Sequence, residues 1–193
     1  MAGVTAEDFK AAMASFAAGV TVVTMVDAGG APHALTATAF SSLSKTPPLC
    51  LVCVDKRARA HPLLLASRRF AINILSADQS ALSEQCAKTS VDKLAKVAWG
   101  WGRATGCPII ARALTSLECE LVDVHAGGDH DIFVGHILDT AVNGGEPLVY
   151  FRGAYAVLSS PVRKHEASRS GGDIAAVSSD LSSSISEEPV LFK

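Results

Sequence analysis

The sequence has no apolar run long enough to cross a membrane. Its longest uncharged apolar stretch, residues 11–26, is short and is interrupted by Ser15, Gly19, Thr21 and Thr24, whereas a bilayer core requires about 20 apolar residues in a helix. The basic start and the cleavage site of a secretory leader are also missing. We therefore expect a protein of the cytoplasm, with no membrane as partner.

Excess charge of either sign is nearly absent. Lys and Arg number 17 and Asp and Glu number 19, which gives a formal net charge of -2, and the pI is about 6.3. This balance provides no electrostatic reason to expect nucleic acid or an anionic membrane as partner. We expect the protein to bind small molecules instead.

The cysteines do not form the paired motifs of a zinc finger. Five cysteines, an odd number, favour a reducing compartment over a disulfide framework. Cys50 and Cys53 stand three residues apart in a β-type run, where they lie on opposite faces of a strand and cannot readily share a metal. We predict packing roles for all five: Cys50, Cys53, Cys86, Cys107 and Cys119.

Several common catalytic motifs are missing as well. The sequence contains no Walker loop, no G-x-S-x-G elbow and no H-E-x-x-H helix. Gly100, Gly102 and Gly106 approximate a dinucleotide-binding fingerprint, but the last interval is one residue too long and no strand is predicted before it. These absences argue against a hydrolase and against a Rossmann-type site.

Histidines and aspartates cluster around one turn, as ligands of a metal would. Yet His130 and His136 are roughly 20 Å apart if the strand is extended, too far to share one ion. We predict no metal site, and a hydrogen-bonded structural role for His136, as for His33 and His125. His130 differs because it follows Gly127, Gly128 and Asp129 in a tight turn. There it can project into a cleft while Asp129 or the backbone fixes its orientation.

The most unusual stretch that is present is TATAFSSLSKTPPL, residues 36–49. Six hydroxyl side chains alternate with small apolar residues, and Pro47 and Pro48 end the run. Small side chains let a flat ligand approach the backbone, and hydroxyls with main-chain N–H groups can hold a phosphate. The alternative is a Ser/Thr-rich strand and turn exposed to water.

The length of 193 residues fits one domain with a sizeable core. We place this domain at residues 1–160. Residues 161–193 are Ser-rich and low in aromatics, which predicts a flexible or partner-docked tail. The hydrophobic fraction of 49% and the mean hydropathy of +0.29 are high for a monomer. They favour a homodimer.

Local patterns predict many short strands and few helices. A first helix carries Phe9, Met13 and Phe16, with Thr5 as N-cap and Gly19 as its end. Later helices are expected at 63–65 and from Ser76 to about Ala87, and a loop at 99–108. Strands are expected at 20–26, 32–40, 49–54, 70–75, 115–124, 132–138, 148–151 and 155–158. This order predicts a closed or nearly closed antiparallel β-barrel.

Five segments together resemble the flavin reductase family: FAAGVTVVT, TATAFSSLSKTPPL, FAINIL, GGDHDIFVG and PLVYFRGAY. The resemblance covers about residues 9–158, with the motifs in order. It implies a split β-barrel homodimer that binds FMN, or FAD, and takes hydride from NADH or NADPH. It also implies that reduced flavin passes to a partner monooxygenase.

The resemblance also implies a set of site residues. Those along the isoalloxazine ring and ribityl chain are Thr36, Ala37, Thr38 and Ala39, with Ser44 near the phosphate. Those that close over the ring and phosphate are Cys53, Val54, Asp55, Arg59 and Ala60. Lys93 is a second phosphate candidate, although Leu94 stands where the family usually has Phe. His130 and Tyr155 match positions where the nicotinamide packs.

Other interpretations stay open at this point. Arg59 and Lys93 can be solvated surface charges, and Tyr155 can be an ordinary barrel tyrosine. The function can also be that of an electron carrier that holds FMN without turnover. A third possibility is a split-barrel flavin oxidase of a small substrate.

Overall fold

The structure of the protein is a computed structural model, which describes residues 3–89 and 92–158. These described residues belong to one compact unit. The tail predicted at 161–193 lies outside the described residues. None of the helices in the described part of the chain is long and apolar enough to span a membrane.

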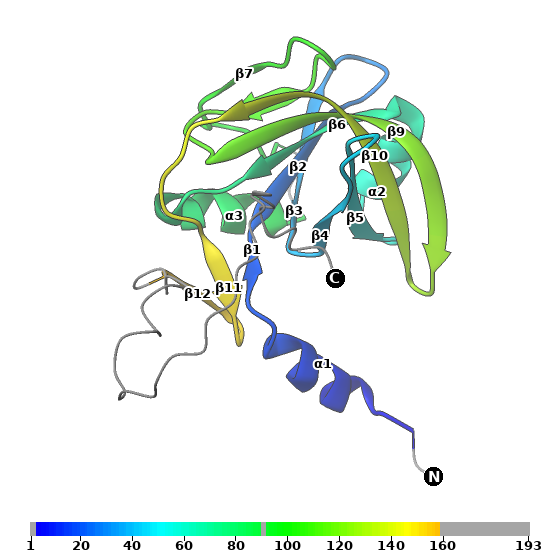
Figure 1. The fold of residues 1–193 in the computed structure, drawn as a ribbon, viewed down its shortest axis with the longest axis vertical. Coiled ribbons are helices and arrows are strands. Elements are labelled where there is room, and N and C mark those ends of the chain that lie inside the picture. Colours follow the sequence, from blue (N-terminus) through cyan, green and yellow to red (C-terminus); the bar gives the residue numbers. More distant parts are fainter. Residues whose placement is uncertain (1–2, 90–91, 159–193) are drawn as a thin grey trace, which may run out of the picture. The chain divides into compact units, whose positions relative to one another are not determined.

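A seven-stranded antiparallel sheet forms the body of this unit (Figure 1). Its order is β3-β2-β6-β9-β10-β5-β4, so half of the neighbouring pairs in the sheet are not consecutive in the chain. The chain is mainly β with few short helices, as predicted. The strands are β2 (Thr21–Val26), β3 (Pro32–Ala37), β4 (Phe40–Ser44), β5 (Leu49–Asp55), β6 (Arg69–Ile74), β9 (Thr115–Gly127) and β10 (His130–Val142).

The two edge strands of this sheet, β3 and β4, follow one another in the chain. Only Thr38 and Ala39 separate them, and the Cys53 N–H donates to the Ala39 carbonyl at 2.9 Å. The strand predicted at 32–40 is therefore wrong at its end, because the chain bends after Ala37 and leaves β2 to pair with β5. This bend connects the two edge strands of the sheet.

Two smaller sheets complete the fold. β1 (Ala18–Gly19), β11 (Val149–Phe151) and β12 (Ala154–Ala156) form one, in the order β1-β11-β12. The other pairs β7 (Trp99–Trp101) with β8 (Pro108–Ile110), so the prediction of a loop over 99–108 was wrong at its two ends and is confirmed for 102–107. Strands of three residues are too short to show an alternating pattern in the sequence. Gly100 inside β7 further weakens the signal for a strand, because it has no side chain to pack.

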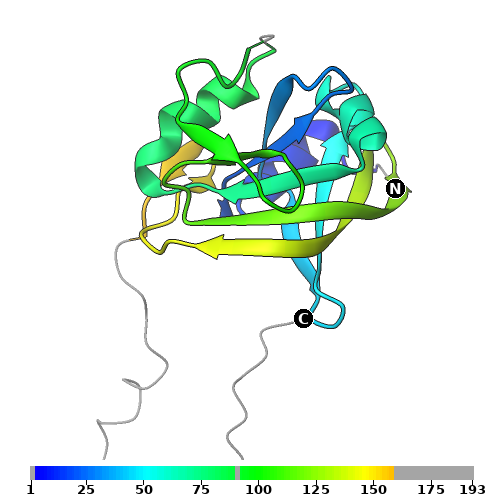
Figure 2. The same ribbon diagram turned by 90° about the horizontal axis from the view of Figure 1, so that it is seen from above.

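The helices are short and locally capped. They are α1 (Ala6–Ala14), α2 (Ala60–Ser67), the 3-10 helix η1 (Ala77–Gln79) and α3 (Ser80–Ala87). The predicted N-cap Thr5 of α1 is confirmed and forms a capping box with Asp8, but the helix ends at Ser15 and not at Gly19, which belongs to β1. Ser76 and Gln79 form a second capping box at the start of η1. α2 and α3 lie toward opposite sides of the sheet (Figure 2).

Two apolar cores lie on either face of β2, whose first five residues are all buried. Val23 and Met25 pack inside the curved sheet with Phe70 and Phe133. Val22 faces the other way, into a second core that includes residues of α3 and β8. Alternate side chains of β2 therefore pack into the two cores, so neither face of this strand is exposed.

Gly135 in β10 provides a test of packing in the first core. A Cβ atom at this position would lie 2.5 Å from Phe70 Cζ and 3.0 Å from Cys119 Cβ, and both side chains are fully buried. We expect Gly135→Ala to lower the free energy of unfolding by roughly 1–3 kcal/mol, measured by urea denaturation. Gly100→Ala, where a Cβ meets nothing within 4 Å, is the control. Equal effects of the two substitutions would contradict this account of the core.

Candidate functional site

The turn between β9 and β10 presents His130. His130 pairs with Gly127 across a turn of two residues, Gly128 and Asp129, and Gly128 has φ +75°, a conformation that favours glycine. The His130 side chain is 42% exposed, and its Nδ1 lies 2.8 Å from Asp129 Oδ1. This hydrogen bond is the main cause that lowers the pKa of Asp129. Of the two groups predicted to orient His130, the backbone and Asp129, it is Asp129 that contacts its ring.

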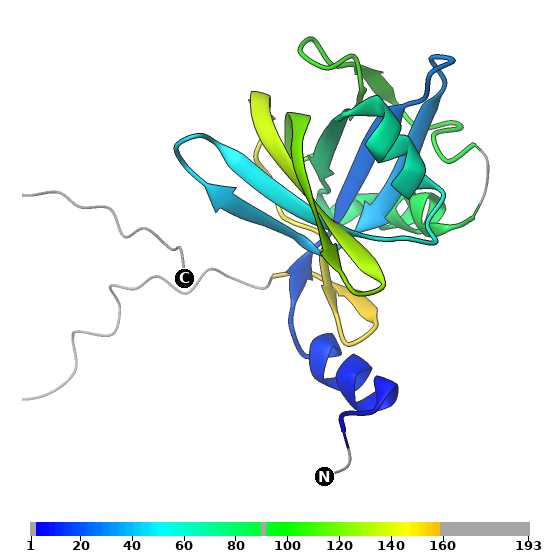
Figure 3. The same cartoon turned by 90° about the vertical axis from the view of Figure 1, so that its right-hand side faces the viewer.

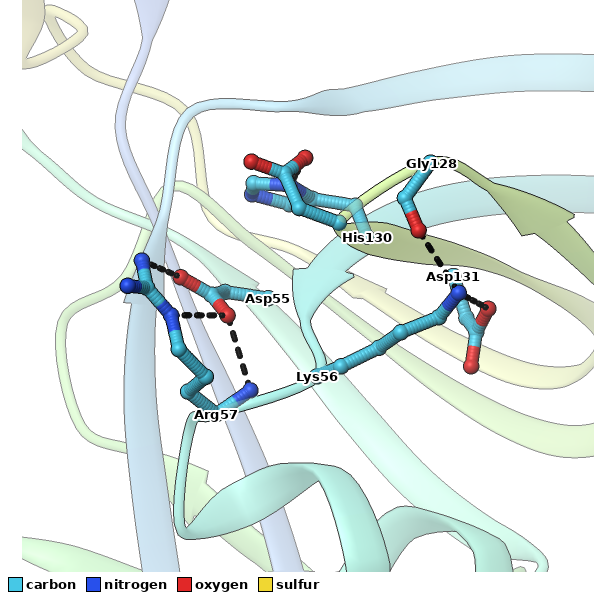
Figure 4. Close-up of polar contacts among 7 residues, drawn as sticks. Asp55, Lys56, Arg57, Gly128, His130 and Asp131 are labelled. Carbon is cyan, nitrogen blue, oxygen red and sulfur yellow. Dashed lines mark hydrogen bonds and ion pairs between the residues drawn. The ribbon is translucent and has the colours of Figure 1, made fainter.

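Asp55 lies opposite His130 in the sheet. It accepts a hydrogen bond from the Arg57 backbone at 2.8 Å and is paired with the Arg57 guanidinium (Figure 4). Arg57, followed by smaller contributions that include His130, lowers the pKa of Asp55 to about 2. Asp55 is therefore ionised at neutral pH beside the turn, and the Arg57 guanidinium is its ion-pair partner.

Arg59 and Lys93 form the second part of the site. Arg59 is the N-cap residue of α2, and its side chain makes no capping hydrogen bond. Burial is the main cause that lowers the pKa of Lys93; Cys86 opposes this, and the positive charge of Arg59 adds to it. Within residues 3–89 and 92–158, neither cation pairs with a carboxylate. Two neighbouring cations without a carboxylate are a suitable place for an anion.

Local hydrogen bonds hold the backbone around Lys93. The Gln85 side chain, from α3, donates to the carbonyls of Lys93 and Ala95, both at 2.9 Å. Lys93 and Arg59 are far apart in the sequence, so only the fold brings these charges near each other. Ser90 and Val91, the first residues of the SVDKL stretch, lie outside the described residues.

The predicted ring-binding stretch is only partly available to a ligand. The Thr36 hydroxyl already donates to the Ser83 carbonyl at 2.7 Å, and the Ala37 carbonyl accepts from Thr21 at 2.7 Å. Thr38 and Ala39, at the bend, are exposed. Ser44 is partly exposed near the end of β4. Of these positions, the bend has the freest polar groups.

Cys53, Val54 and Ala60 differ in what they can offer. Val54 is 1% and Ala60 5% exposed, and both belong to the core, so only their main-chain atoms could touch a ligand. Cys53 is partly exposed on the opposite face from Cys50, as predicted. Burial raises the pKa of the Cys53 thiol, so the thiol is neutral at neutral pH.

Tyr155 and Thr36 both hydrogen-bond to the same residue of α3, Ser83. The Tyr155 hydroxyl donates to Ser83 Oγ at 2.9 Å, and its ring packs edge-to-face with Tyr150 at 5.6 Å between centroids. Ser83 is buried and was missed from the sequence, where a serine in a short helix gives no signal of its role. In the described residues, Thr36, Ser83 and Tyr155 form a group separate from Asp129 and His130.

An apolar cleft of about 600 Å³ lies between α1, the bend after β3 and the β11–β12 hairpin. α1 and this hairpin extend from the same end of the sheet (Figures 1 and 3), and the Arg152 N–H donates to the Ala14 carbonyl at 2.9 Å. Thr38 and Ala39 line the cleft together with Phe9, Met13, Phe16, Phe40 and Tyr150. Part of the predicted flavin stretch therefore faces an open apolar space.

The histidine and aspartate cluster around the turn does not gather into a metal site. Among the residues that the structure describes, no group of three or more His, Cys, Asp or Glu could hold a metal ion. Instead His125 pairs with Asp123 at 3.2 Å, and His33 pairs with Asp27 at 2.8 Å. The hydrogen-bonded role predicted for His33 is confirmed, whereas His125 makes only this contact between two largely exposed side chains.

This fold and these residues match a known family. The sequence matches the family described as "Flavin reductase like domain" over residues 13–159, a span that contains the turn, the bend and both cations. The chain belongs to this flavin reductase-like family.

Three similar proteins illustrate the range of the family. The stachydrine N-demethylase reductase subunit Stc3 of Rhizobium meliloti (strain 1021) is 41% identical over 169 residues, 87% of this chain and 72% of that protein. The reductase component of a 4-nitrophenol 4-monooxygenase/4-nitrocatechol 2-monooxygenase of Rhodococcus opacus is 39% identical, over 77% of this chain and 78% of that protein.

The third is a solved structure, the NADH:FAD oxidoreductase SgcE6 of Streptomyces globisporus C-1027 in complex with NAD and FAD fragments. It superposes with a TM-score of 0.77 at 34% identity and covers 82% of this chain and 98% of that one. The chain spans about half the length of some longer relatives, 46% of one protein and 52% of one solved structure.

Proposed function

We propose that this protein is an NAD(P)H:flavin oxidoreductase that supplies reduced flavin to a partner monooxygenase. It takes hydride from NADH or NADPH and transfers it to FMN, or to FAD. The observation that carries the proposal is the family match over residues 13–159, which includes every predicted site residue. The names of the relatives, one a reductase component of a monooxygenase and one an NADH:FAD oxidoreductase, support it.

The residues present suit a flavin with a phosphate. Arg59 and Lys93 are neighbouring cations without a carboxylate partner in the described chain, and an Arg guanidinium matches phosphate geometry. Thr38 and Ala39 combine small side chains with exposure at the apolar cleft. The phosphate is therefore assigned to the two cations and the ring to the bend.

The protein's role in the reaction is to bind and to align. A bound flavin and a reduced nicotinamide supply the hydride chemistry between them. The chain then has to hold two flat rings at reactive distance, which needs no acid or base from the protein. His130, exposed at the turn and oriented by Asp129, is assigned to pack against the nicotinamide, and Tyr155 is assigned a second packing position.

The sheet is assigned as a split β-barrel and the protein as a homodimer. The meeting of β3 and β4 at the bend supports the barrel. α1 buries none of its residues in the described chain, and Phe9, Met13 and Phe16 are 62%, 53% and 72% exposed. An apolar helix face beside an apolar cleft is what a second copy of the chain would cover.

The first prediction concerns turnover. Under anaerobic conditions, a trace of purified protein mixed with free FMN and NADH or NADPH should bleach many flavins per protein, because reduced flavin leaves the site. Loss of the oxidised-flavin absorbance band measures it. Bleaching of one equivalent or none would indicate instead an electron carrier, or an oxidase with another donor.

The second prediction concerns the phosphate. Arg59→Gln and Lys93→Gln should each raise the Kd of FMN by a factor of about 10 to 150, because a charge-assisted hydrogen bond contributes about 1.5–3 kcal/mol. The Kd of riboflavin, which has no phosphate, should change less than about twofold; fluorescence titration measures both. Arg103→Gln, an exposed arginine elsewhere, serves as the control. Equal losses for FMN and riboflavin would refute the phosphate assignment.

The third prediction concerns the homodimer. The wild-type protein should be dimeric in light-scattering chromatography, and Phe9→Asp combined with Met13→Lys should make it monomeric, because charges would replace the apolar face of α1. Val142→Lys, at an apolar residue that is 76% exposed on β10, should leave the dimer intact. A monomeric wild type would rule out the homodimer, and a dimer that survives the double substitution would rule out α1 as its interface.

A further inference from the structure

Lys56 holds the β9–β10 turn from the end of β5 through three contacts. Its backbone N–H donates to the Asp129 carbonyl at 3.0 Å, and its ammonium donates to the Gly128 carbonyl at 2.7 Å. The same ammonium lies 3.3 Å from Asp131 Oδ1 (Figure 4). The turn that presents His130 is thus fixed at two carbonyls and one carboxylate.

Asp131 connects the β9–β10 turn to the start of α2. Its Oδ2 accepts a hydrogen bond from His61 Nε2 at 2.8 Å, and the two side chains are only 14% and 11% exposed. The His61 ring packs edge-to-face on buried Phe133, with 5.3 Å between centroids. The hydrogen bond from His61, with the contribution of Lys56, lowers the pKa of Asp131 despite the opposing effect of burial. The carboxylate is therefore ionised at neutral pH.

The position of this cluster gives it a role. Lys56 and His61 flank the short segment that carries Arg59, assigned to the flavin phosphate. Neighbouring residues of a strand point to opposite faces, so Asp131 faces α2 while His130 faces away from it. One partly buried carboxylate therefore connects the segment with Arg59 to the turn with His130.

We propose that Asp131, together with Lys56 and His61, is a positioning residue that sets His130 relative to the start of α2. This inference rests on the proposed function, because it assigns the cluster to the alignment of the nicotinamide with the flavin. Hydride transfer requires reacting atoms about 3–3.5 Å apart. A turn released from α2 would keep His130 but lose its alignment.

The test is a double-mutant cycle of Asp131→Asn and His130→Ala. Asp131→Asn keeps the size of the side chain and removes the charge that Lys56 and His61 contact. It should lower kcat/KM for the nicotinamide about tenfold in the wild-type background. In the His130→Ala background, Asp131→Asn should lower kcat/KM less than about twofold, because the effects of two residues that act through one another are not additive. Equal losses in both backgrounds would overturn the proposal.

Three further measurements distinguish positioning of His130 by Asp131 from a purely structural role of Asp131. Asp131→Asn should change the Kd of FMN less than about twofold, since Arg59 and Lys93 remain. Lys56→Met, at a side chain that is 41% exposed, should lower kcat/KM in the same direction with little risk to folding. Asp139→Asn, an exposed aspartate on the same strand, should leave kcat/KM unchanged. If Lys56→Met also leaves it unchanged, the positioning role is wrong.

This inference and the proposed function fail in different ways. If wild-type protein reduces no free flavin with NADH or NADPH, the proposed function fails and the positioning role fails with it. If the wild type turns over and Asp131→Asn matches it, only the positioning role is wrong. Urea denaturation of each variant at the assay temperature shows whether a lost rate reflects an unfolded fraction, and rates are compared per folded protein.

Discussion

The bend at Thr38 and Ala39 is the constraint on which the arrangement of the site depends. One continuous segment pairs with β2 before the bend and with β5 after it, and the Cys53 N–H of β5 continues the β4–β5 ladder to the Ala39 carbonyl. The bend thus connects the two edge strands of the sheet, and both β5 and α2 contact β3. Small side chains at the bend, where Val or Ile would ordinarily stabilise a strand, leave an exposed surface beside an apolar cleft.

The charged residues around this bend fall into two groups, those that have an ion-pair partner and those that have none. Arg57 is committed to Asp55, Lys56 and His61 to Asp131, and His130 to Asp129. These pairs hold turns and fix orientations. Arg59 and Lys93 instead have no carboxylate partner in the described residues, and the positive charge of Arg59 contributes to lowering the pKa of Lys93. The same short segment after β5 therefore supplies both the rigid parts of the site and its free charge.

Much of the fold could be predicted because its signals are local. The capping boxes at Thr5 and Ser76, the opposite faces of Cys50 and Cys53, and the strand nature of the chain all follow from residues within one turn or one strand. The errors also have local causes. Residues 99–101 pair with 108–110 as β7 and β8, but three-residue strands show no periodicity, and the bend after Ala37 has no Gly or Pro to mark it. Strands β9 and β10 are longer than predicted because exposed polar residues continue them beyond the apolar core.

The sequence by itself determined the strands, the caps, the turn that presents His130 and membership of the flavin reductase-like family. Only the tertiary structure decided which polar groups are free. Thr36 and Tyr155 meet at Ser83, Asp131 meets His61, and Arg59 approaches Lys93. Each contact joins residues far apart in the chain, and strand register and sheet curvature, which no local pattern encodes, set the distance between them.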